Sequence, residues 1–143
     1  MIPGFLTLAI DPGKHEYGWA LAEDYTLIDA GLKKVARDKP GFIFEPNEIV
    51  VEMPQQRGTR SRVRVSDLLD LAYFAGAVAG VEALRVQPSR WKGSESKESM
   101  HERLATLLST QEKKVLEEVA VSKSKRHNVL DAACLLLWRL KRM

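Results

Sequence analysis

The stretch "LAIDPGKHEYGWALAE", from Leu8 to Glu23, decides how the chain begins to fold. Two apolar runs flank a turn sequence at Pro12 and Gly13, a pattern that predicts two antiparallel strands joined by a short turn. Asp11 closes the first run just outside the expected core, and no basic residue within the strand is spaced to pair with it. Two interpretations are open: Asp11 forms the turn, or its carboxylate has a function.

Length and composition limit the class of protein. The chain has 143 residues, and we expect a single domain over residues 1–143 with a sizeable core. A lone cysteine excludes an internal disulfide and a cysteine-rich zinc site, and Cys134 is expected to be a small buried apolar residue. Neither a membrane span nor a signal peptide is evident, so we expect a cytoplasmic protein. The net charge of +3 is compatible with nucleic-acid binding without establishing it.

Strand and helix patterns continue beyond the first hairpin and predict a mixed sheet. "TLIDAGLKKV" (26–35) adds a third antiparallel strand. The apolar runs "EIVVEMP" (48–54) and "RVQP" (85–88) predict two parallel strands, connected by a right-handed crossover through a helix over residues 66–84. Loops are expected over residues 55–64 and 89–97, and helices over residues 98–108, 109–119 and 122–143. The sequence therefore predicts an α/β fold, a mixed sheet covered by helices.

Three acidic residues interrupt apolar stretches. Asp11 ends the first strand, Glu52 ends the "EIVVEMP" strand, and Asp131 lies inside the apolar last helix. Because an unpaired buried carboxylate costs on the order of several kcal/mol, three at these positions suggest a common partner. Oxygen-rich clusters suit Mg²⁺ or Mn²⁺. For Glu52, an ion pair with Arg57 or Arg60 is the alternative.

Four stretches, in order along nearly the whole chain, resemble the RuvC-type Holliday junction resolvases. They are "LAIDPGKHEYGWAL" (8–21), "VVEMPQ" (50–55), "PSRWKGSESK" (88–97) and "HNVLDAACLLLW" (127–138). The likeness is greatest to the short RuvC-like endonucleases of bacteriophages and their relatives. It implies an RNase H-like fold, in which a mixed five-stranded sheet carries helices on both faces.

The resemblance also implies an activity and its partners. The family's members are crossover junction endodeoxyribonucleases that cut branched DNA as homodimers with two Mg²⁺ or Mn²⁺ ions, in a bacterial cell or, if phage-encoded, in the host cytoplasm. Small and aromatic residues in the helix that begins near Ser66 predict the dimer interface. The alternative is that the small residues pack on the sheet of the same chain. The alternatives are a nuclease of the same fold acting on flaps, forks or structured RNA, and a junction-binding protein without catalysis.

The resemblance assigns catalytic and metal-binding roles to Asp11, Glu52 and Asp131. The family has a further acidic or histidine ligand one turn before the last aspartate. Here His127 lies four residues before Asp131 and Asn128 three, so both share its helix face. Imidazole is the better ligand and base, so we expect His127 to be catalytic and metal-binding, with Asn128 as the alternative. The other role open to His127 is contact with a DNA phosphate, together with Lys125 and Arg126.

Basic residues flank the expected carboxylate site. We expect DNA phosphate contacts from Arg57, Arg60, Arg62, Arg64, Lys92, Lys97, Lys125 and Arg126. A solvated loop is the alternative for the four arginines. Trp91 either stacks on a base or belongs to the core, and His101 is expected to be a surface residue. Gly18 forms no phosphate-binding motif and is expected to permit close backbone packing.

Overall fold

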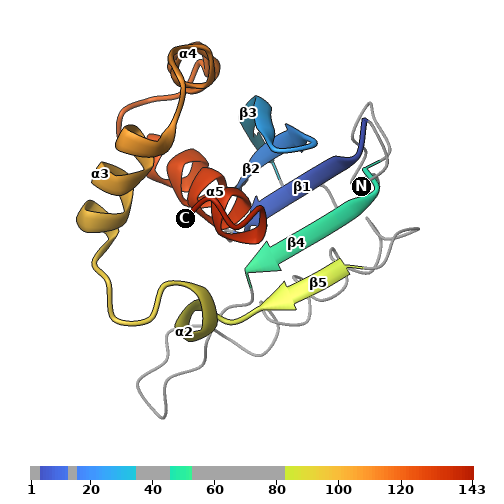
Figure 1. The fold of residues 1–143 in the computed structure, drawn as a ribbon. Coiled ribbons are helices and arrows are strands. Elements are labelled where there is room, and N and C mark those ends of the chain that lie inside the picture. The colour runs from blue at the N-terminus through green and yellow to red at the C-terminus, as the bar shows by residue number, and fades with distance from the viewer. Residues whose placement is uncertain (1–3, 13–15, 35–45, 53–82) are drawn as a thin grey trace.

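The computed structural model describes residues 4–12, 16–34, 46–52 and 83–143. Its strands are β1 (Leu6–Asp11), β2 (Glu16–Glu23), β3 (Thr26–Lys34), β4 (Glu48–Glu52) and β5 (Ala83–Val86). The first three form the antiparallel meander that the hairpin pattern predicts, while β4 runs parallel to β1 and β5 parallel to β4. The order β3-β2-β1-β4-β5 confirms the expected mixed five-stranded sheet (Figure 1).

The described helices are α2 (Pro88–Trp91), α3 (Lys97–Leu107), α4 (Thr110–Glu117) and α5 (Arg126–Arg139). The loop expected over residues 89–97 is wrong in part, because Pro88 starts α2 at the position where the fixed φ of proline favours a helix. The long last helix is also shorter than expected. It begins at Arg126 rather than Ser122, and no side chain caps its start.

The prediction of a crossover helix over residues 66–84 is wrong at its end, because Ala83 and Leu84 pair with Ile49 and Val50 as part of β5. The rest of that helix, with the predicted dimer interface, lies outside the described residues. The arginine-rich segment 55–64 lies outside them, as does the connection before β4 except for residues 46 and 47.

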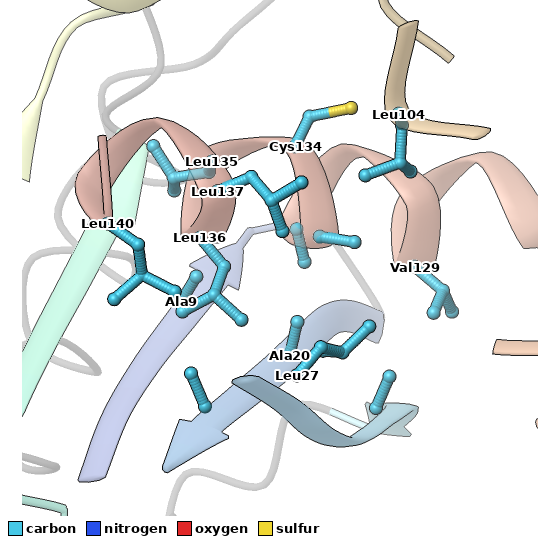
Figure 2. Close-up of a cluster of buried hydrophobic side chains, with 14 of the residues drawn as sticks. Ala9, Ala20, Leu27, Leu104, Val129, Cys134, Leu135, Leu136, Leu137 and Leu140 are labelled. Atoms are coloured by element: carbon cyan, nitrogen blue, oxygen red, sulfur yellow. The ribbon is translucent and has the colours of Figure 1, made fainter. Parts of the chain in front are cut away.

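Helix α5 packs across one face of the sheet, over β1 and β2 (Figure 1). Small strand residues make room for it, and Figure 2 shows leucines of α5 above Ala9 and Ala20. Cys134 is buried in this cluster, as expected. A second buried cluster, with Ile10 and Val51, lies on the opposite face. Because strand side chains alternate between faces, Asp11 and Glu52 point to the α5 side, as Ala9 and Val50 do.

A buried carboxylate joins α4 to the sheet and to the end of the chain. Glu112, only 3% exposed, completes the predicted capping box with Ser109 and accepts the backbone N–H of Leu27 at 2.8 Å. Arg142 donates to both of its oxygens, at 2.6 and 2.9 Å. Burial alone would raise the pKa of Glu112, but these hydrogen bonds outweigh burial and lower it from 4.5 to about 2.

We expect the Glu112→Gln variant to lose about 2–3 kcal/mol of unfolding free energy at neutral pH, since a shift of this size is worth at most about 3 kcal/mol. The folded protein binds this proton more weakly than the unfolded chain, so the stabilisation is complete above about pH 5 and disappears as the pH falls toward 2. Urea unfolding of both proteins at pH 7 and pH 3 tests this. The difference between them should shrink by about half at pH 3, and a constant difference contradicts the assignment.

Candidate active site

The candidate site lies where parallel strands β1 and β4 end. Asp11 is the last residue of β1 and Glu52 the last of β4. The register that pairs Ile10 with Val51 brings the two carboxylates to the same level on neighbouring strands. The sheet geometry thus gathers two of the three predicted carboxylates on the face that α5 covers.

Asp131 completes the group from α5. It is 8% exposed, although its neighbours Ala132, Ala133 and Cys134 are apolar. Burial raises the pKa of Asp11 well above its usual range, and the negative charges of Glu52 and Asp131 raise it further. Burial likewise raises the pKa of Glu52, against the opposing charge of Lys92. The three carboxylates therefore lie close enough to repel one another.

The distance of α5 from the sheet is set at Gly18, which lies opposite Asp11 on β2. A Cβ atom at Gly18 would lie 2.1 Å from the backbone oxygen of Asn128, far inside van der Waals contact. The expectation that Gly18 permits close backbone packing is confirmed. The glycine allows the first turn of α5, which carries His127 and Asn128, to lie directly on β2 beside Asp11.

Helix α3 contacts both oxygens of Asp131. Nε2 of His101 lies 2.7 Å from Oδ1, and Nζ of Lys97 lies 3.3 Å from Oδ2. Burial lowers the pKa of Lys97, but the charge and hydrogen bond of Asp131 outweigh burial and leave it raised. His101 is therefore not the surface residue we expected. The sequence held a signal that His101 lies near the buried face of α3, since it follows buried Met100 and precedes buried Leu104 by one turn.

Helix α2 contacts Glu52 in the same way. Trp91 donates its indole Nε1–H to Oε2 at 3.1 Å, and Nζ of Lys92 lies 3.5 Å from Oε1. The ammonium group of Lys92 also lies 5.3 Å from the centre of the Trp91 ring. Of the two interpretations of Trp91, the structure favours the core, since the residue is buried. The ion pair of Glu52 in the described residues is with Lys92, and Arg57 and Arg60 lie outside them.

The carboxylate oxygens of Asp11, Glu52 and Asp131 are of the kind that hard divalent cations bind. The three carboxyl groups of Asp11, Glu52 and Asp131 lie among two ammonium groups, those of Lys92 and Lys97, so the acidic groups outnumber these basic ones. A phosphodiester brought to this site would add another negative charge, so a hard cation with oxygen ligands is the natural complement. Within the described ranges, however, no three Asp, Glu, His or Cys side chains lie close enough to share one ion as they stand.

The other predicted site residues lie on or just before α5. His127 is exposed and Asn128 half-buried, and neither side chain forms a hydrogen bond or ion pair with the described part of the chain. Lys125 forms an ion pair with Glu16 at 2.7 Å. Arg126 donates to the carbonyl oxygens of Leu116 and Val119, at the end of α4. Their predicted phosphate contacts stay predictions.

For the fourth ligand, we expect His127→Ala to reduce the cleavage rate by about a hundredfold and Asn128→Ala by about tenfold or less. The reason is that imidazole can bind a metal or accept a proton, whereas an amide is a weak ligand. Single-turnover cleavage at saturating branched DNA measures both. A larger loss from Asn128→Ala reverses the assignment.

No protein-family model matches the sequence, and no curated protein matches it. Solved structures match the fold. The structure of RuvC from Thermus thermophilus aligns with a TM-score of 0.61 and 19% identity, over 94% of this chain and 92% of that one. The chain has the RuvC fold. At this identity the likeness concerns the fold alone, and it confirms the expected RNase H-like architecture.

Two protein–DNA complexes are also similar in structure. T. thermophilus RuvC bound to a Holliday junction substrate aligns with a TM-score of 0.57 and 18% identity, over 94% of this chain and 91% of that one. The fowlpox virus resolvase, in complex with Holliday junction DNA, aligns with a TM-score of 0.58 and 13% identity, over 96% of this chain and 97% of that one. None of the helices in the described segments has the length and apolar character of a membrane span.

Proposed function

We propose that the protein is a metal-dependent, structure-selective DNA endonuclease that resolves four-way junctions and related branched DNA by hydrolysing phosphodiester bonds. One observation carries the proposal: Asp11 and Glu52 end neighbouring parallel strands on the face that α5 covers, and α5 adds buried Asp131, in a chain with the RuvC fold. Structures of the same fold, from T. thermophilus and fowlpox virus, were solved with Holliday junction DNA.

Asp11, Glu52 and Asp131 would hold the metal in this proposal, and His127 is the proposed fourth ligand. When bound, divalent ions supply Lewis-acid stabilisation of the charge that develops on the phosphodiester. The side chains themselves have separable tasks. Lys97 is more than half exposed, so its ammonium group is available to a DNA phosphate as well as to Asp131. The four arginines 57, 60, 62 and 64 would extend this phosphate contact.

Cleavage assays on matched substrates test the proposal. Four-way, flap, fork and linear DNAs of the same sequence would be incubated with Mg²⁺ or Mn²⁺, with structured RNA as a further substrate. We expect paired cuts in the four-way junction and little cleavage of linear DNA. Preferential cutting of flaps or RNA would mean that these, and not four-way junctions, are the substrate. Junction binding without cleavage in either metal would indicate a binding protein.

We also infer that the protein acts as a homodimer, because a four-way junction presents two equivalent strands and a two-fold dimer presents two sites. Light scattering at micromolar concentration should give twice the mass of the 16.1 kDa chain. An active monomer contradicts this. A cytoplasmic site of action belongs to the same proposal and is checked by cell fractionation.

A further inference from the structure

We propose that Trp91 and His101 are positioning residues, each of which orients one metal-binding carboxylate through a ring N–H donor. Trp91 would orient Glu52, and His101 would orient Asp131. The inference rests on the proposed function, since it concerns how the same carboxylates are held. It assigns a task to a buried tryptophan and to a histidine that the sequence pattern placed on the surface.

The hydrogen bond from Trp91 orients the carboxylate of Glu52. An indole has only a donor, so Trp91 cannot itself bind a cation. Its ring is buried, and that packing aims Nε1 at Oε2 of Glu52 from a distance of 3.1 Å. Lys92 takes the other oxygen, Oε1. Trp91, the last residue of α2, and Lys92, which follows it, therefore contact both oxygens of one carboxylate.

The contact between His101 and Asp131 repeats this arrangement on α3. His101 follows buried Met100, whose backbone oxygen lies 3.8 Å from Sγ of Cys134 on α5, so the two helices are in contact at this level. Nε2 approaches Oδ1 at 2.7 Å, while Lys97, one turn earlier, takes Oδ2. Again one ring nitrogen and one ammonium group share the two oxygens.

Both pairs of donors come from one continuous stretch of the chain, from Trp91 at the end of α2 to His101 on α3. Asp11 accepts no side-chain hydrogen bond from the described residues, and burial and like charge dominate its surroundings. Hydrogen-bond donors behind metal-binding side chains fix their orientation, and losing one typically weakens metal affinity about 10–100-fold. We therefore expect Trp91 and His101 to set the metal affinity without touching the metal.

The test measures Mn²⁺ binding to the purified protein, from the loss of the electron paramagnetic resonance signal of free Mn²⁺. We expect Trp91→Phe, which keeps most of the ring, and His101→Ala to weaken binding about tenfold. His101→Gln, whose amide nitrogen can replace Nε2, should stay within about threefold of the unaltered protein. Urea unfolding, recorded in parallel, separates an effect on the site from a loss of folding.

Matched controls make each outcome decisive. Trp138→Phe removes the same atoms from half-buried Trp138 on α5, and Glu102→Gln alters an exposed residue next to His101, so both should bind Mn²⁺ normally. Unchanged affinity in Trp91→Phe or His101→Ala overturns the inference, as does His101→Gln binding no better than His101→Ala. If Glu52→Gln and Asp131→Asn also bind Mn²⁺ normally, the proposed metal site itself is wrong.

Discussion

Cleavage of branched DNA is expected to fall by at least about a thousandfold when Asp11, Glu52 or Asp131 is replaced singly by its amide. A divalent cation contributes several kcal/mol of transition-state stabilisation, and about 4 kcal/mol corresponds to a factor of about a thousand. Each amide keeps the shape of the side chain but removes the charge that would hold the cation. The measurement is single-turnover cleavage of a four-way junction in Mg²⁺.

Junction binding should survive these changes, because the carboxylates repel phosphates rather than bind them. Each replacement removes a negative charge near the DNA, so affinity should be unchanged or slightly higher.

For Asp11→Asn we also expect a higher melting temperature at neutral pH. Burial and the charges of Glu52 and Asp131 raise the pKa of Asp11, so the ionised carboxylate destabilises the folded state and the neutral amide removes that penalty.

Glu117→Gln is the matched control, since Glu117 is an exposed residue of α4 and loses the same charge. It should cleave normally. If an amide variant of Asp11, Glu52 or Asp131 cleaves at near the normal rate, the assignment of that residue as a metal ligand is wrong. Loss of junction binding together with cleavage would instead point to a structural role.

The fold was predictable where local signals agree with the final contacts. The apolar runs on either side of Pro12 and Gly13 predict β1 and β2, and the serine–glutamate spacing from Ser109 predicts the start of α4. The three acidic interruptions predict the carboxylate group, because charge in an apolar strand or helix has no local explanation. Parallel pairing of β1 with β4 then brings Asp11 and Glu52 to one level.

The surroundings of the carboxylates were not predictable in the same way. Lys97 and His101 approach Asp131 only because α3 packs against α5, a contact between residues 30 or more positions apart. The indole N–H of Trp91 reaches Glu52 across 39 positions, through a four-residue helix too short to leave a periodic pattern. Sequence periodicity reports which face is buried, whereas these contacts depend on how separate elements meet.

The Gly18→Ala variant is expected to lose both stability and cleavage. Its Cβ would enter the backbone of Asn128 and Val129, which cannot rotate away as a side chain can. Overpacking of this kind costs about 3 kcal/mol, which for a chain of this size lowers the melting temperature by about 10 °C. Since the first turn of α5 would move away from β2, Asp131 would shift relative to Asp11. A displacement of about 1 Å at a reacting site can reduce the rate about a hundredfold.

Gly31→Ala separates the two effects. A Cβ at Gly31 would also meet a neighbour too closely, at 2.9 Å, but that neighbour is the side-chain ring of Trp19. Gly31 lies on β3, two strands from β1, so its replacement should lower the melting temperature without moving α5. Both variants are to be assayed at a temperature where urea unfolding shows them fully folded. We expect Gly31→Ala to cleave normally and Gly18→Ala about a hundredfold more slowly. Equal rates would mean that the close approach of α5 at Gly18 contributes to stability alone and does not set the geometry of the carboxylates.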